Sequence, residues 1–254
     1  MNTGVNKSTA VDSFVITATE SHDELLRHFF KRMKLLVVDA EERFQSALQT
    51  AFSTTLIDVV TACNRHEATT AIAASSAHWH CWIMEINLEC EGLDIVEDHP
   101  QFPFVIIHSG MGSMEQAARA IRLGVAEVID KTAGSINRLI TKTCALLPLG
   151  MLCRGMLPKN RDVFFTLTKS IIINHREWAE KVNLSLRQLE NICNLHTGLS
   201  PSLVLPFYYG MQYLLHTTID LHDLPVEYVI NERFFLDCLE FVSMKIGMYG
   251  GLVS

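Results

Sequence analysis

Short apolar segments alternate with helical segments through the first half of the sequence, and this alternation constrains the fold more than any other feature. The apolar segments are four or five residues long, which suits buried strands, and turn residues separate them from segments with helical spacing. Strands that alternate with helices in this way build a doubly wound parallel sheet. We therefore predict an α/β domain with five strands, at Leu35–Val38, Leu56–Val60, Trp82–Ile86, Phe104–His108 and Val125–Ile129, and with helices at Ala40–Phe52, Glu67–Ala74, Met114–Leu123 and Ile136–Leu147.

Changes in this pattern divide the chain into four predicted parts. Residues 1–33 form an N-terminal extension, in which Leu25, Leu26, Phe29 and Phe30 recur at helical spacing before Met33. Residues 34–147 contain the alternating pattern. Residues 148–158 are interpreted as a linker because they are rich in proline and glycine, and residues 159–254 show helical patterns without strand alternation.

Composition favours a soluble cytoplasmic protein. No apolar run reaches the ~18 residues of a membrane span, so we expect no membrane association. The N-terminus lacks the basic and apolar stretches of a secretory signal. The seven cysteines are scattered without a C-x-x-C pair, which favours reduced thiols over a disulfide framework.

Polar residues stand where the predicted strands end. Asp39 follows the first strand, Glu85 lies at the end of the third, Ser109 follows the fourth, and Lys131 comes just after the fifth. In an open parallel sheet, ligands bind at the carboxyl ends of the strands. These four side chains are therefore the candidate residues of one pocket.

The same succession resembles the receiver domain of bacterial response regulators. The stretches that carry the resemblance are LLVVDAEERF, WIMEINL, VIIHSG and GVAEVIDK. A receiver has an acidic pair after its first strand, a phosphoryl-accepting Asp after the third, a Ser or Thr after the fourth and a Lys after the fifth. The resemblance implies a flavodoxin-like fold and places Asp39, Glu85, Ser109 and Lys131 at four of these positions.

Two departures from the receiver pattern affect its chemistry. Ala40 stands in the second place of the acidic pair, and a methyl group cannot coordinate Mg²⁺, so we expect weak or no Mg²⁺ binding and no other cofactor. Glu85 replaces the accepting Asp, and its extra methylene extends the carboxylate by about 1.5 Å, which disturbs a transfer that depends on positioning. Val128 is a third departure, since many receivers carry an aromatic residue there.

Three interpretations of this pocket remain open. In the first, Glu85 and Lys131 form a fixed ion pair that holds the domain in one state without phosphorylation. In the second, the pocket is a relic and the pair merely satisfies two charges. In the third, phosphorylation occurs elsewhere in the pocket.

The segment WAEKVNLSLRQLENICNLHTGLSP resembles the first helix-turn-helix of AraC-type regulators. Ser185 and Gln188 have the spacing of a capping box at a helix start. The resemblance implies an all-α AraC-like domain whose recognition helix, Leu186–Leu195, enters the major groove of DNA. Its matching residues are Ala179, Ser185, Leu189, Gly198 and Pro201, and its DNA-binding candidates are Ser185, Arg187, Gln188, Asn191 and Asn194. A second segment, Leu224–Leu252, resembles another unit of this family only in its aromatic positions.

The charge of this region weighs against simple DNA binding. Residues 155–254 contain eight Lys or Arg against ten Asp or Glu, whereas many DNA-binding proteins use ~6–10 phosphate contacts. Leu203–Leu215 carries several aromatic side chains and no basic residue, which is typical of buried core or of a protein interface. Two hypotheses follow: control of transcription through DNA binding, or capture of a protein partner by a degenerate domain.

Three further patterns complete the sequence-based expectations. The acidic residues Glu89, Glu91, Asp94, Glu97 and Asp98 form either a solvated face or a surface for a basic partner. His78 and His80 lack further ligands, so we predict no metal site, and Ser109 lacks the context of a hydrolase nucleophile, so we predict no enzyme. By the receiver resemblance, a homodimer would form through Met114–Leu123, Val125–Ile129 and Ile136–Leu147.

Overall fold

A computed structural model provides the structure of the protein. It describes residues 33–218, except residues 56, 75–78, 88–91, 101, 111–112, 154–155 and 157–160, together with residues 237 and 238. The helix predicted before Met33 and the second unit predicted at Leu224–Leu252 lie outside the described residues, apart from Met33, residue 237 and residue 238.

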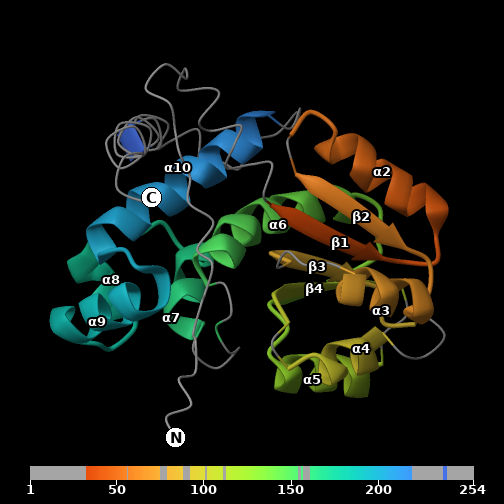
Figure 1. Cartoon of the computed structure of the whole chain (residues 1–254), viewed down its shortest axis with the longest axis horizontal. Coiled ribbons are helices and arrows are strands. Elements are labelled where there is room, and N and C mark those ends of the chain that lie inside the picture. The colour runs from red at the N-terminus through yellow and green to blue at the C-terminus, as the bar shows by residue number, and fades with distance from the viewer. Residues whose placement is uncertain are drawn as a thin grey trace, which may run out of the picture.

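The centre of the molecule is a five-stranded sheet in which every pairing is parallel. Its strand order is β2-β1-β3-β4-β5, which is the flavodoxin-like order (Figure 1). This order confirms the predicted receiver-like α/β fold. The strands are β1 Lys34–Val38, β2 Asp58–Ala62, β3 Cys81–Met84, β4 Phe104–Ser109 and β5 Glu127–Asp130.

Helices cover both faces of the sheet because alternate strand residues point to opposite sides. On β1, Leu35 and Val37 belong to one buried hydrophobic cluster, which also contains residues of α2 and α6. Leu36 and Val38 belong to a second cluster on the opposite face, which also contains residues of α3, α4 and α5. All four side chains are fully buried, which explains why the strands read as unbroken apolar runs. The helices are α2 Glu42–Phe52, α3 Arg65–Ala74, α4 Gly92–Asp98, α5 Met114–Leu123 and α6 Ser135–Leu152.

Strand boundaries differ from the prediction by one or two residues. The fifth strand was predicted to start at Val125, but β5 starts at Glu127. Gly124 ends α5 in the left-handed conformation, and the backbone N–H of Val125 still bonds the carbonyl of Ala120 in that helix. The apolar side chain of Val125 therefore belongs to the helix cap and not to the strand.

The predicted end of α6 at Leu147 is wrong, because the helix continues through Pro148 and Gly150 to Leu152. Residues 148–152 of the predicted 148–158 linker are thus helical. The residues from 143 to 150 are buried on all sides, so packing outweighs the helix-breaking tendency of the proline. Gly150 lies so close to the backbone of His80 that a Cβ atom there would collide with its carbonyl. This glycine therefore marks a point of close packing between α6 and the backbone that precedes β3.

The C-terminal described residues form a group of helices beside the sheet. Figure 1 shows α7, α8 and α9 on one side, with α6 and α10 between them and the sheet. One continuous hydrophobic core contains Leu35 of β1, Leu147 of α6, Trp178 of α8 and Tyr208 of α10. The elements are α7 Asp162–Phe165, a 3₁₀ turn η2 Thr166–Thr168, α8 His175–Lys181, α9 Leu186–Thr197 and α10 Pro201–Thr218.

The aromatic helix α10 is part of this core. Tyr208, Tyr209 and Met211 are at most 1 % exposed, which confirms the buried-core alternative for these residues. The hydroxyl of Tyr209 accepts the backbone N–H of Ile172 at 2.7 Å. Within the part of the chain that the structure describes, no helix is both long and apolar enough to cross a membrane.

A buried arginine joins the helical group to the sheet. The guanidinium of Arg161 donates to the carbonyls of Met156 and Phe102, and it lies 5.7 Å from the ring of Phe102 and 5.3 Å from that of Phe104. Burial lowers the pKa of Arg161 to about 10, which still leaves it charged at neutral pH. The cation is thus stabilised by carbonyl dipoles and aromatic faces, so this junction has a defined geometry.

Replacing Gly150 with Ala tests the close contact between α6 and His80. The added methyl group forces α6 away from the backbone of His80, so we expect a loss of about 1–3 kcal/mol in the free energy of unfolding. Urea denaturation measures this loss. Gly110→Ala is the matched control, because its Cβ would meet only Lys131 carbons at 3.8 Å or more. Equal stability of the two variants would contradict the prediction.

Candidate functional site

The carboxyl ends of four strands bring Asp39, Glu85, Ser109 and Lys131 together. The ammonium of Lys131 lies 2.7 Å from Oδ2 of Asp39 and 2.7 Å from Oε2 of Glu85. The predicted pair of Glu85 with Lys131 is therefore one half of a bridge. The other half, the contact between Lys131 and Asp39, was not predicted from the sequence.

The sheet itself positions these residues. The backbone N–H of Asp39 bonds the carbonyl of Ala62, that of Glu85 bonds Val38, and that of Lys131 bonds Ser109. Each bond continues the pairing of two adjacent strands, so the side chains start from one rigid edge. Local backbone groups then orient the carboxylates: Oδ1 of Asp39 accepts from the N–H of Glu41 at 2.9 Å, and Oε1 of Glu85 accepts from Asn87 at 3.1 Å.

The first residue of α4 also supports this edge. Gly92 approaches the carbonyl of Glu85 so closely that any Cβ atom would collide with it, and its N–H bonds the carbonyl of Ile86. Only glycine allows this approach. The backbone of Glu85 is thus held from both sides, by β1 and by the start of α4.

Burial makes the pocket electrostatically strong. The side chains of Asp39, Glu85 and Lys131 are 2 %, 11 % and 20 % exposed. Burial raises the pKa of Asp39, and the hydrogen bonds from Lys131 and Glu41 offset this only in part. For Glu85, burial also raises the pKa, but the bonds from Lys131 and Asn87 outweigh it and the pKa is lowered. For Lys131, the two carboxylates outweigh burial and raise the pKa, so the ammonium stays charged.

The pocket does not fit a divalent cation. Ala40, at the expected place of a second acidic ligand, is exposed and has no donor atom. The two carboxylates that are present already share one ammonium. Among the residues placed by the structure, no group of three or more His, Cys, Asp or Glu side chains could hold a metal ion.

Two aromatic residues close the pocket, and the sequence analysis missed both. The ring of His108 stacks on Phe44 with 4.6 Å between centroids, and the ammonium of Lys131 lies 5.3 Å from the Phe44 ring. Nε2 of His108 lies 3.0 Å from the hydroxyl of Ser135, the first residue of α6. Burial and the nearby Lys131 lower the pKa of His108 to about 4, so it is neutral at physiological pH. Phe44 matched the apolar pattern of a helix, which concealed this contact.

Ser109 completes the pocket without making a full hydrogen bond. Its hydroxyl is buried and has no partner with good geometry among the described residues, although it is close enough to Glu85 to lower the pKa of that carboxyl. Val128 is half-buried on β5. The pocket therefore contains the Lys131 ammonium, which bridges two carboxylates, and the Ser109 hydroxyl, which has no well-formed hydrogen bond among the described residues.

The predicted helix-turn-helix corresponds to α8 and α9. Ser185 caps α9, and its side chain and that of Gln188 form the expected capping box. Gly198 ends the helix with a φ of 71°, and Leu189 and Cys193 are fully buried. Two of the five DNA-binding candidates, Ser185 and Gln188, are thus engaged with each other. The other three, on the outer face of α9, are exposed: Arg187, Asn191 and Asn194.

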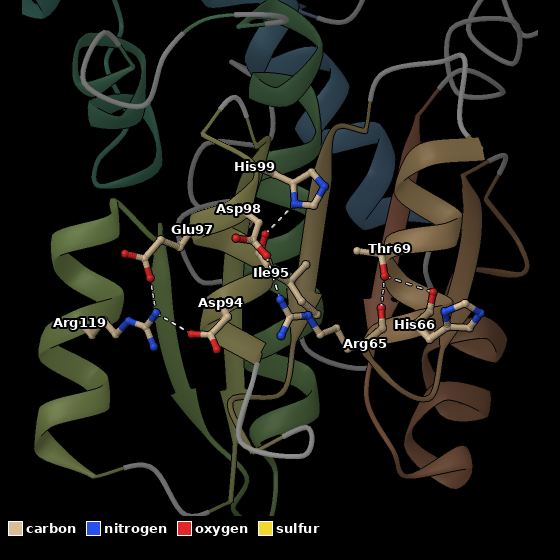
Figure 2. A network of polar contacts seen from close by, with 9 residues as sticks. All are labelled: Arg65, His66, Thr69, Asp94, Ile95, Glu97, Asp98, His99 and Arg119. Atoms are coloured by element: carbon tan, nitrogen blue, oxygen red, sulfur yellow. Dashed lines mark hydrogen bonds and ion pairs between the residues drawn. The ribbon is translucent and has the colours of Figure 1, made fainter.

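The described members of the acidic run form ion pairs within the molecule. Figure 2 shows Arg119 of α5 directed at Asp94 and Glu97, and Arg65 of α3 directed at Asp98. The Arg119–Asp94 distance is 2.6 Å and the Arg65–Asp98 distance is 2.9 Å. These pairs connect α3, α4 and α5, and they favour the solvated-face interpretation. Glu89 and Glu91, the other two members of the run, lie outside the described residues.

Of the two histidines considered as metal ligands, His78 also lies outside the described residues. His80 is described, and its Nδ1 accepts a hydrogen bond from the backbone N–H of Lys34.

Comparisons with known proteins give structural likenesses only. No family model matches the chain, and no curated protein matches it. The signal receiver domain of a LuxO repressor protein from Vibrio parahaemolyticus is 21% identical, with a TM-score of 0.43, over 48% of this chain and 94% of that one. A two-component response regulator from Clostridium difficile is 18% identical, with a TM-score of 0.41, over 45% and 95%. The signal receiver domain of an HD domain-containing protein from Pseudomonas fluorescens is 19% identical, with a TM-score of 0.42, over 47% and 97%.

Replacing Lys131 with Met tests the bridged cation. The change leaves two buried carboxylates without their partner, and we expect a loss of about 3 kcal/mol in the free energy of unfolding at pH 7. Without the ammonium, both carboxyl pKa values rise. The loss should therefore be greatest above these raised values and shrink as the pH falls through them, because protonation removes the unpaired charges.

Urea denaturation between pH 4 and pH 8 measures this dependence. Lys142→Met is the matched control, because Lys142 pairs with Glu127 at 3.4 Å at a more exposed position. We expect this control to lose much less stability. A loss in Lys131→Met that did not change with pH would contradict the electrostatic explanation.

Proposed function

We propose that the chain is an atypical response regulator whose receiver-like domain works without aspartyl phosphorylation and which controls transcription through α8 and α9. The observation that carries this proposal is the Lys131 ammonium, 2.7 Å from both Asp39 and Glu85. The bridge supports the interpretation in which the pocket is held in one state by its own charges.

The ion pairs leave no suitable phosphoryl acceptor in the pocket. Glu85 stands at the accepting position, but one of its oxygens contacts Lys131 and the other accepts the N–H of Asn87. Asp39 is nine-tenths or more buried and is bonded to Lys131 and Glu41. In-line phosphoryl transfer requires a free, aligned oxygen and a metal ion to stabilise charge, and neither requirement fits these residues.

The geometry of α8 and α9 supports the proposed output. A short helix, a turn and a capped second helix pack on α10, and the second helix exposes a polar face. Arg187, Asn191 and Asn194 on this face carry the side-chain groups that commonly contact base edges and phosphates.

A protein partner is the second candidate because residues 155–254 contain more acidic than basic side chains. The exposed basic side chains of the described helical group are Lys169, Arg176, Lys181 and Arg187, and Lys181 pairs with Glu177 at 3.2 Å. Because the aromatic side chains of α10 are buried, such a partner would contact exposed apolar residues such as Ile173 and Leu195, which are 64% and 78% exposed.

We also propose a homodimer through α5 and β5. Met114 and Ile121 are 90% and 70% exposed, and they lie seven residues apart on one side of α5. The predicted dimer face also included α6, but the second half of this helix is buried within the chain and is not accessible to a second copy. The available part of that helix is its first two turns, where Arg138 and Lys142 pair with Glu127 of β5.

Incubation with Mg²⁺ and a small phosphodonor tests the first half of the proposal. We expect no phosphoryl adduct by intact-mass spectrometry, because the carboxylates are engaged and no second acidic ligand stands at Ala40. The double variant Ala40→Asp with Glu85→Asp restores the receiver pattern, and it is the positive comparison. Stoichiometric acyl-phosphate on the unaltered protein would refute this half of the proposal.

Retention on non-specific duplex DNA tests the second half. The four exposed basic side chains of the described helical group predict weak binding at low salt, with a slope of log K against log[salt] of about −3.6. A titration between low and physiological salt measures this slope. Absence of retention at low salt would reject DNA binding and favour the protein partner.

A further inference from the structure

The pocket holds an amine and a carboxyl group as closely as two reacting groups. The Nζ atom of Lys131 lies 2.7 Å from Oδ2 of Asp39, and each of these residues is bonded through its backbone N–H to an adjacent strand. The two groups therefore have little freedom to separate. Well-oriented partners within one molecule reach effective concentrations of about 10⁵–10⁸ M, far above those of the same groups in solution.

The surroundings of this contact favour a neutral product over an ion pair. The Asp39 side chain is 2% exposed, and the ring of Phe44 lies 5.3 Å from the Lys131 ammonium. A buried charge loses its hydration and depends on its partners for compensation. An amide carries no charge and needs no such compensation. Amide formation between Lys131 and Asp39 removes one ammonium and one carboxylate from the buried pocket.

Glu85 is placed to carry the protons that amide formation requires. An ammonium becomes a nucleophile only after it gives up a proton, and Oε2 of Glu85 lies 2.7 Å from that of Lys131. Burial raises the pKa of Asp39, which favours its protonated form. For Glu85, the hydrogen bonds that it accepts outweigh burial, and the pKa is lowered. The two carboxyl groups thus suit different roles, with Asp39 as the acyl group and Glu85 as the proton carrier.

We propose that Lys131 and Asp39 condense within the folded protein to form an intramolecular isopeptide bond. Glu85 first transfers one proton from the ammonium to Asp39, which gives a free amine and a carboxylic acid. The bond between Nζ and Cγ then forms. Glu85 carries a second proton from Nζ to the departing hydroxyl, and the Cγ–O bond breaks to release water. One ammonium and one carboxylate become one amide and one water molecule, so no cofactor or oxidant is needed.

This inference deepens the first half of the proposed function and rests on it, because it concerns how the pocket is held in one state. The bond joins the residue after β1 to the residue after β5 and closes the chain between them into a loop. Such a loop restricts the unfolded chain and stabilises the fold. It also removes the Asp39 carboxylate as a phosphoryl acceptor.

Intact-mass spectrometry of the full chain under denaturing conditions tests the isopeptide bond. We expect a mass about 18 Da below that of the sequence, because condensation releases one water molecule. After digestion with trypsin, the peptides that contain Asp39 and Lys131 should be joined. Lys131→Arg should restore the full mass because a guanidinium stays protonated, and Glu85→Gln should restore it because the proton carrier is lost. Lys34→Arg is the matched control and should keep the deficit, because Lys34 pairs with the half-exposed Asp58 at 3.7 Å.

The outcomes separate this inference from the proposed function. Unaltered protein with the full sequence mass refutes the isopeptide bond, and the proposed function stands if the phosphodonor also leaves no adduct. A deficit without joined peptides at Asp39 and Lys131 refutes the bond as well, and an unchanged deficit in Glu85→Gln refutes the role of Glu85. The full mass together with stoichiometric acyl-phosphate refutes both proposals. The measurement on the unaltered protein decides the question even where a variant does not fold.

Discussion

The arrangement of the molecule depends on the burial of α6 between the sheet and α10. The first turns of this helix close the receiver-like fold, and its second half is buried on all sides by the helical group. Burial of apolar surface at this scale outweighs the poor helix propensity of Pro148 and Gly150. Because the hydrophobic core continues from β1 to α10, the pocket and the helices α8 and α9 belong to one packed structure. The pocket contacts α6 directly, where Nε2 of His108 lies 3.0 Å from the hydroxyl of Ser135.

The pocket lies at the carboxyl ends of the parallel strands. Its two carboxylates share one ammonium, and the stacked rings of His108 and Phe44 lie beside them. The ammonium of Lys131 places positive charge between the two carboxylates. This contact is the physical reason for proposing regulation without phosphorylation.

The pair of helices α8 and α9 shows a similar separation between local structure and charge. Its caps, buried residues and turn glycine are present, but basic side chains are few and Lys181 is engaged by Glu177.

The sequence by itself determined the five strands to within two residues and the start of α9, because buried strands must be apolar and capping residues must follow local rules. It also identified the four residues at the strand ends, since parallel strands bring their carboxyl ends together. Only the tertiary structure decided that Lys131 bridges both carboxylates, because the distance between side chains on separate strands depends on sheet packing. It alone showed that α6 continues through Pro148 and that Phe44 and His108 close the pocket. These features arise from contacts between residues distant in the chain, which local periodicity cannot encode.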